Sequence, residues 1–136
     1  MVTPSAPPSR LDRHADFLAR LHLVFAAFNA IVGTGVLAFA IAAALLTGPA
    51  GRERPGAEIA ATLTSAGFLV VAGTALLWAA VHWWCGRALL RRDVRGRWLA
   101  LALATMNAVL FPFGTMLAGY ALWVLLQDET RRLFHA

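Results

Sequence analysis

The fold of this chain is decided by one stretch near its C-terminus, WLALALATMNAVLFPFGTMLAGYALWVLLQ, residues 98–127. The stretch carries no charge, and arginines flank it on both sides. As one α-helix it would be about 45 Å long, whereas the hydrocarbon core of a bilayer is about 30 Å thick. FPFGT, residues 111–115, interrupts it, because proline pushes the preceding residue out of helical geometry. The stretch therefore predicts a hairpin of two short helices, over about 97–111 and 114–127, with both charged ends on one side of a membrane.

The composition indicates a membrane protein. Of the 136 residues, 60% are hydrophobic and only 14% are charged, whereas soluble domains have about 25% charged residues. Two further apolar stretches, about 20–46 and 59–84, are long enough to cross a bilayer. The net charge of +5 does not indicate nucleic-acid binding, because the arginines lie in short segments beside the apolar stretches and no groove-reading motif is present.

The distribution of charge predicts the topology. With four spans, the N-terminal arginines, the basic segment 87–97 and the pair Arg131-Arg132 lie on one side, and the nearly neutral segment 52–58 lies on the other. We therefore expect an all-α membrane protein with four transmembrane helices in an antiparallel bundle and both termini cytoplasmic. The last two helices have only about 15 apolar residues each, against the usual 17–25 or so, and a re-entrant pair that does not fully cross is the alternative.

The N-terminal residues are predicted to lie outside the membrane domain. Residues 1–9 contain three prolines and are expected to form a disordered cytoplasmic tail, and residues 10–136 a single transmembrane domain. Ser9 and Asp12 have the spacing of a capping box, in which a hydroxyl and a carboxylate satisfy the first free N–H groups of a helix. The first helix should therefore begin at Arg10.

Small residues predict one packing face in the first span. They recur at every fourth position, at Ala26, Ala30, Thr34, Ala38 and Ala42. Helices in lipid associate where small side chains allow their backbones to approach, and we expect this face to contact another helix. The simpler interpretation is that alanine is merely common in this chain.

Further packing residues are expected elsewhere. Asn29 and Asn107 are predicted to be buried amides that bond across helices to Thr, Ser or a backbone carbonyl, though not to each other. At the hairpin turn, Pro112 and Gly114 should shape the backbone and Thr115 should cap the last helix. Ala118 continues this small-residue surface into the last helix.

His22 and His82 are the sharpest candidates for chemistry. With antiparallel first and second spans, both lie near the cytoplasmic boundary at comparable depth. Two facing imidazoles in a helix bundle could ligate a haem, which would make the chain a haem-binding or redox subunit. The simpler interpretation is that both are amphipathic interface residues, with His82 belonging to the belt of Trp83 and Trp84.

Other reactive groups give weaker signals. Cys85 follows two tryptophans and is three residues from His82, which is compatible with two metal ligands but leaves two more to be found. A lone cysteine of this kind is more often an inert packing residue. No acidic residue lies within any predicted span, whereas proton pumps and ion-coupled transporters need ionisable groups at membrane depth.

The C-terminal third carries a resemblance to a known family. The segment 111–117 reads FPFGTML, 120–126 reads YALWVLL, and Leu133-Phe134 follow. This resembles a family of small bacterial membrane proteins that end in F-P-F-G-T-x-L-G-x-Y/F-T-x-W-V-L-L…L-F. The chain departs from that pattern where Ala118 replaces the family's glycine. The resemblance implies four spans and the bacterial inner membrane, and it implies no activity.

The sequence thus favours a small integral inner-membrane protein without enzymatic activity. We expect it to pack against itself or a larger membrane complex within the lipid bilayer, without a cofactor. The haem-binding subunit that uses His22 and His82 is one alternative, and a carrier of small molecules or lipids, with a polar cavity between its helices, is another.

Overall fold

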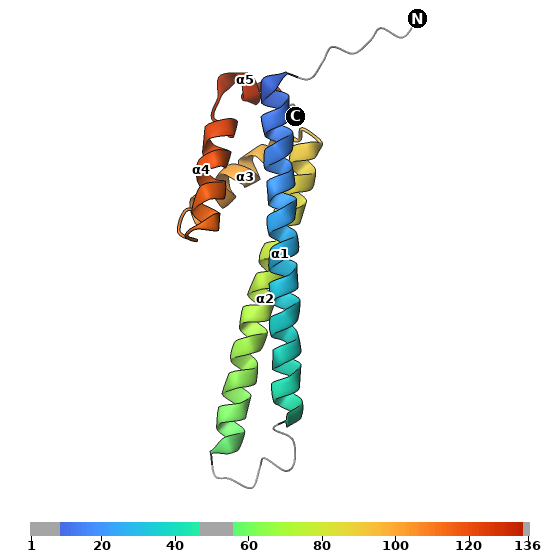
Figure 1. The fold of residues 1–136 in the computed structure, drawn as a ribbon, viewed down its shortest axis with the longest axis vertical. Helices are drawn as coiled ribbons and strands as arrows, with labels where there is room; N and C mark the ends of the chain where they lie inside the picture. Colours follow the sequence, from blue (N-terminus) through green and yellow to red (C-terminus); the bar gives the residue numbers. More distant parts are fainter. Residues whose placement is uncertain (1–8, 47–55, 135–136) are drawn as a thin grey trace, which may run out of the picture. The chain divides into compact units, whose positions relative to one another are not determined.

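The computed structural model describes residues 9–46 and 56–134, and the regular elements of this part of the chain are helices (Figure 1). They are α1 (Arg10–Leu46), α2 (Ala57–Leu90), α3 (Val94–Asn107), α4 (Phe113–Leu125) and α5 (Asp128–Arg131). The all-α class predicted from the sequence is therefore confirmed. Residues 1–8 of the tail predicted over 1–9, and residues 47–55 between the first two spans, lie outside the described residues.

Two helices have the length and composition of membrane spans. They cover Arg10–Leu45 and Ile59–Leu90, and only 17% and 6% of their most apolar windows are buried within the protein. The core helix of a soluble protein would bury most of such a window, so these faces are suited to lipid. Helices α3 and α4 have 14 and 13 residues, or about 20 Å each, and a crossing needs about 30 Å. Four crossings are therefore not confirmed.

The predicted capping box starts α1. The Ser9 hydroxyl accepts from the Asp12 N–H at 3.1 Å, and the Asp12 carboxylate accepts from the Ser9 N–H at 3.0 Å. The first helix begins at Arg10, as the sequence predicts. Helix α2 runs to Leu90, six residues beyond the predicted end at 84, because nothing in its sequence stops a helix there.

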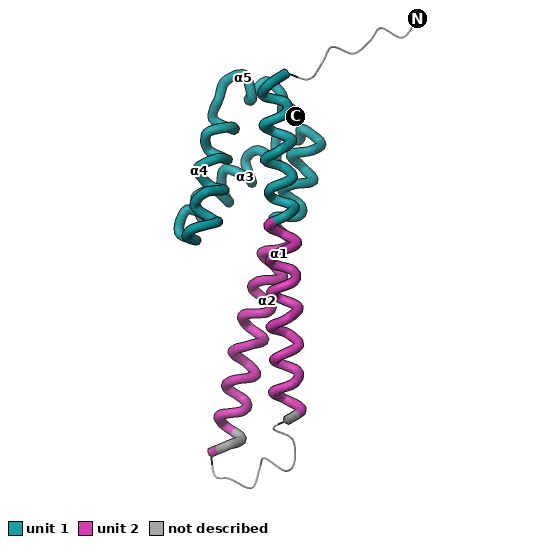
Figure 2. Tube along the Cα trace, viewed as in Figure 1, with its two compact units in different colours: residues 1–24, 82–136 teal, residues 25–81 magenta. Residues whose placement is uncertain are grey.

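The chain divides into two compact units (Figure 2). Unit 1 comprises residues 1–24 and 82–136, and unit 2 comprises residues 25–81. Helices α1 and α2 each contribute a segment to both units, whereas α3, α4 and α5 belong to unit 1 alone.

Unit 2 shows which small residues of α1 face inward. Ala26 and Ala40 are buried, and a Cβ added to Gly33 would lie 2.8 Å from Leu76 Cγ of α2. These three positions are seven residues apart, which is the repeat that keeps one helix face against another.

The predicted four-residue stripe follows this face only at its start. Ala26 is buried and Ala30 half-buried, whereas Thr34, Ala38 and Ala42 are exposed. Each step of four residues rotates the position by about 40° around the helix, so the stripe drifts away from the contact. The predicted packing face is corrected accordingly.

The core of unit 1 contains side chains from several helices. Its fully buried apolar side chains include Leu18 of α1, Leu89 of α2 and Leu125 of α4. A Cβ on Gly96, in the first turn of α3, would lie 2.7 Å from Ala88 Cβ, which shows how closely α3 begins against the end of α2. Ala118 is also buried, at 2% exposure, within the α4 face of this core.

The α3–α4 turn differs from the predicted one. Helix α3 ends at Asn107 rather than at 111, and the Phe111–Pro112 peptide bond is cis. Pro112 occupies the N-cap position of α4, so Thr115 does not cap that helix. Its hydroxyl instead donates to the Ala108 carbonyl at 3.0 Å, beyond the end of α3. A Cβ on Gly114 would lie 2.6 Å from the Asn107 carbonyl oxygen, so this position requires glycine.

Candidate functional site

The structure brings His22 and His82 into direct contact inside unit 1. Their Nδ1 atoms are 2.9 Å apart, and their rings stack with centroids 5.0 Å apart and planes inclined by 26°. His22 is 1% exposed and His82 0%, whereas Trp83 and Trp84 are about half exposed. His82 therefore faces the protein interior and is not part of the tryptophan belt.

Asn107 extends this pair into a chain of three polar side chains, which we call the histidine cluster: His22, His82 and Asn107. The Asn107 amide Nδ2 lies 3.4 Å from His82 Nε2, and Asn107 is 0% exposed. The cross-helix bond predicted for Asn107 thus exists, but its partner is an imidazole rather than a hydroxyl or a carbonyl. Asn29 behaves differently, since its amide donates to the Phe25 carbonyl of its own helix at 2.8 Å.

The orientation of the Asn107 amide determines where the protons of the histidine cluster lie. With the amide in this orientation, Asn107 donates to His82 Nε2, so the His82 proton is on Nδ1 and is donated to His22 Nδ1. The His22 proton is then on Nε2, which has no partner within the described residues. Asn107 Oδ1 is likewise buried without a partner there. Both ends of the cluster are therefore unsatisfied polar atoms, which are rare in folded proteins.

Close helix approach brings the two histidines together. Gly86 follows His82 by one turn of α2, and a Cβ at Gly86 would lie 2.8 Å from the Ala19 carbonyl oxygen of α1. Ala19 precedes His22 by one turn and is fully buried. Sequence reasoning missed Gly86, although a glycine four residues from a histidine on an apolar helix is a signal of close packing.

The geometry does not fit a haem between the two histidines as they stand. Bis-histidine ligation places the iron and the porphyrin plane between two imidazoles. Here the two rings contact each other directly through their Nδ1 atoms. The described residues also contain no group of three or more His, Cys, Asp or Glu side chains that could hold a metal ion. Cys85 is fully buried with its thiol 3.9 Å from the Gly96 carbonyl oxygen, as expected of a packing residue.

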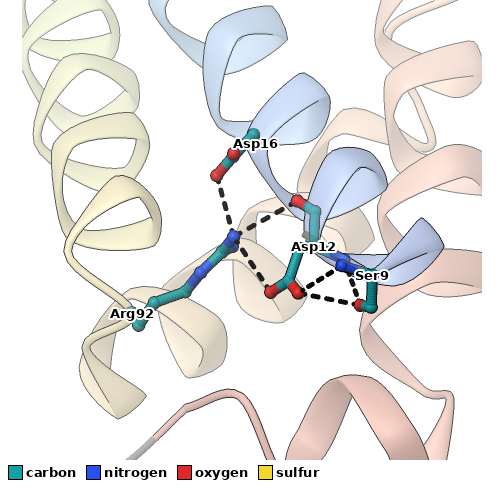
Figure 3. Close-up of polar contacts among 4 residues, drawn as sticks. All are labelled: Ser9, Asp12, Asp16 and Arg92. Carbon is teal, nitrogen blue, oxygen red and sulfur yellow. Dashed lines mark hydrogen bonds and ion pairs between the residues drawn. The ribbon is translucent and has the colours of Figure 1, made fainter. Parts of the chain in front are cut away.

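An ionic cluster lies in the same unit, formed by Ser9, Asp12, Asp16 and Arg92 (Figure 3). The Arg92 guanidinium lies 2.8 Å from the Asp16 carboxylate and 3.5 Å from that of Asp12, and it donates to the Asp12 carbonyl. Arg92 has a φ of 57° in the tight turn between α2 and α3, which orients its side chain toward α1. Hydrogen bonds from Ser9, foremost from its hydroxyl, hold the pKa of Asp12 below its usual value, with Arg92 adding to the effect.

Arg97 connects the start of α3 to the end of α4. Its Nε and Nη2 atoms both donate to the Leu125 carbonyl at 3.2 Å, and the residue is 7% exposed. Arg97 thereby satisfies a carbonyl at the C-terminal end of α4, where a positive charge is also favourable.

No protein-family model, curated protein or solved structure matches the chain. The family resemblance of the C-terminal signature therefore stays a prediction, and the function is argued from the geometry alone.

Proposed function

We propose that this chain is a small integral protein of the bacterial inner membrane that acts by association, with itself or with a larger membrane complex, and not as an enzyme. The observation that carries the proposal is the outer surface of α1 and α2 in unit 2. Large apolar side chains such as Ile31, Phe39 and Leu63 are about two-thirds exposed on these helices. Such a surface is suited to acyl chains and to other apolar helices.

Glycines with empty space beside them on the same helices support a role in association. A Cβ added at Gly35, Gly67 or Gly73 would have nothing within 4 Å. Glycine costs about 1 kcal/mol in a helix relative to alanine, and nothing among the residues that the structure describes requires it at these positions. A second helix that approaches closely from outside would require it.

The proposed topology places both termini on the cytoplasmic side. The basic residues of the N-terminal turns, of the α2–α3 turn and of the chain's end support this orientation through the positive-inside rule. The predicted four-span bundle and an arrangement with two crossings and a re-entrant hairpin both satisfy it, because α3 and α4 form a hairpin in either case.

The haem-binding alternative is less well supported than association. It requires His22 and His82 to separate and exchange their mutual hydrogen bond for iron. A Soret band in the purified protein that His82→Ala abolishes would establish it, and a colourless preparation would exclude it. The carrier alternative stays a prediction that no contact described above supports.

The test of association combines capture and mutation. The tagged chain, extracted in mild detergent, should run as an oligomer or recover a defined membrane partner by mass spectrometry. Gly35→Leu or Gly67→Leu should reduce that association, whereas the equally apolar exchange Leu63→Ile, at another exposed position, should not. A monomer that recovers no partner, or association unaffected by both leucine variants, would overturn the proposal.

A further inference from the structure

The α3–α4 turn presents an apolar surface that the described residues of unit 1 leave exposed. We call it the hairpin tip: Val109, Leu110, Phe111, Phe113 and Met116. Their exposed fractions are 83%, 48%, 86%, 73% and 72%. Scattered apolar residues are normal on a protein surface, but five large side chains gathered at one turn indicate a binding surface or a membrane contact.

Most backbone groups of this turn are hydrogen-bonded within the protein. Leu110 N–H donates to the Asn107 carbonyl and Phe111 N–H to the Val109 carbonyl. Pro112 has no N–H to satisfy. Irregular backbone exposed to lipid is costly because hydrocarbon offers no hydrogen bonds.

Two further bonds close the turn on the side of α4. The N–H groups of Gly114 and Thr115 both donate to the Leu110 carbonyl, at 2.7 and 3.3 Å. The Thr115 hydroxyl donates to the Ala108 carbonyl at 3.0 Å. A turn with apolar side chains exposed and most of its backbone groups paired within the protein is suited to hydrocarbon rather than to water.

The histidine cluster sets the depth of the tip. Asn107, the last residue of α3, contacts His82, which precedes Arg87 by five residues, or about 7.5 Å along α2. His82 in turn contacts His22, which follows Arg20 by two residues, or about 3 Å along α1. The end of α3 therefore lies only one or two helical turns from charged residues, whereas a crossing requires about 30 Å.

Figure 2 agrees with this depth within unit 1. The α3–α4 turn lies at about the level where the unit 1 segments of α1 and α2 end. The opposite end of unit 1 carries exposed arginines, among them Arg91, Arg95, Arg131 and Arg132. Arginines at the entry and exit of the hairpin are suited to anionic headgroups on one face of the bilayer.

We propose that the hairpin tip is a re-entrant membrane anchor, which enters the cytoplasmic leaflet, contacts its acyl chains and returns to the same side. The chain then crosses the membrane twice, through α1 and α2, rather than four times. The inference rests on the proposed membrane location and replaces only the predicted number of crossings. The alternative is that a protein partner, rather than lipid, contacts the hairpin tip, and the experiments below distinguish the two.

Cysteine accessibility tests the depth of the tip. In a Cys85→Ala background, Val109→Cys and Phe111→Cys replace exposed side chains, so neither should disturb folding. Arg132→Cys marks the cytoplasmic side and Arg52→Cys the predicted outer side. In intact cells a membrane-impermeant maleimide should label only Arg52→Cys. In inverted vesicles it should label Arg132→Cys at least about tenfold faster than either tip variant, because thiols in hydrocarbon ionise poorly.

Each other outcome overturns the proposal. Labelling of the tip in intact cells would show that the hairpin crosses. Labelling in inverted vesicles as fast as that of Arg132→Cys would show that the tip lies in water. Full labelling of the tip variants in denaturing detergent is the control for intact thiols.

Lipid contact is tested separately from burial against protein. A fluorophore on Phe111→Cys, in vesicles of phosphatidylethanolamine and phosphatidylglycerol, should be quenched by lipids with a nitroxide on the acyl chain near the headgroup more than by those labelled at the chain end. Absence of quenching by either lipid would show that protein covers the tip and would overturn the proposal. Extraction of the whole chain from membranes by alkali would instead contradict the proposed membrane location, so the two failures are distinguishable.

Discussion

Unit 1 and unit 2 use their polar side chains in opposite ways. In unit 2, Asn29, Thr34, Thr64 and Thr74 each donate to the carbonyl four residues earlier in their own helix. In unit 1, polar side chains join different segments: His22 contacts His82 of α2, Arg92 contacts the start of α1, and Arg97 contacts the end of α4. These polar side chains thus bond within their own helix in unit 2 and between segments in unit 1.

This difference indicates how each unit is specified. Apolar packing in lipid depends on close approach and is tolerant of small shifts, whereas a buried polar pair is satisfied in one register only. Unit 1 should therefore have one defined arrangement, held by contacts that a single substitution can break. Unit 2 should tolerate exchanges along its outer surface, which is the part of the chain that lipid or a partner would contact.

The largest expected contrast comes from one substitution made in both units. In Gly86→Leu, the new side chain meets the Ala19 backbone at 2.8 Å, and we expect a loss of about 3 kcal/mol in the free energy of unfolding, from overpacking. Gly67→Leu, in the unit 2 part of the same helix, enters space that is open in the single chain, and in the unassociated chain it should be neutral or stabilising by up to about 1 kcal/mol. Thermal unfolding in detergent measures both, and equal losses would contradict the distinction between the units.

The histidine cluster gives the next largest effect. His82→Leu leaves the buried His22 Nδ1 and the Asn107 amide without their observed partner, and we expect it to cost about 1–3 kcal/mol. His22→Leu should cost a similar amount, and the double variant should cost less than the sum, because the coupling between contacting residues is typically about 0.5–3 kcal/mol. Additive losses would show that the two rings do not depend on each other.

Unit 2 offers a matched control for this comparison of single and double histidine variants. Thr74→Val removes a hydroxyl that bonds only to its own helix, and it should change stability by no more than about 0.6 kcal/mol. A loss as large as that of His82→Leu would show that the polar groups of both units contribute alike.

The sequence was sufficient to predict features that depend on local chemistry. The start of α1 at Arg10 follows from Ser9 and Asp12, and the two long helices follow from uninterrupted apolar stretches. Antiparallel spans also predict a comparable depth for His22 and His82, whereas their direct contact was only one of the alternatives left open.

Features that depend on tertiary geometry were not predictable in this way. The drift of Thr34, Ala38 and Ala42 away from the contact depends on the crossing of two helices, which a four-residue pattern does not encode. The sequence predicts that Asn107 bonds across helices, but to a hydroxyl or a carbonyl. Its contact with His82 depends on how α3 packs against α2, which no residue pattern in the sequence specifies.

A smaller effect is expected at the ionic cluster. Arg92→Gly keeps the positive φ of the turn and removes the contacts with Asp12 and Asp16, and we expect a loss of about 1 kcal/mol, since the pair is partly shielded from water. Arg131→Ala is the control, because its contact with Asp128 is largely exposed and should contribute nothing measurable. Added salt should reduce the difference in the free energy of unfolding between Arg92→Gly and the native chain, because salt screens the ion pairs.

The smallest expected effect is a pH dependence of unit 1 that originates at Asp12. Its pKa is lower in the folded chain than in the unfolded one, mainly because the Ser9 hydroxyl donates to the carboxylate. A carboxyl group with a lowered pKa stabilises the fold above its unfolded pKa of 3.8, and this contribution is lost as the pH falls through the folded value. Below about pH 5 the unfolding temperature of Asp12→Asn should therefore fall less steeply with decreasing pH than that of the native chain. Ser9→Ala should reduce the slope in part. Thr64→Val in unit 2, which removes a hydroxyl but no titrating group, should leave the slope unchanged. A slope that Asp12→Asn leaves intact would place the acid sensitivity outside the capping box and remove this contrast between the units.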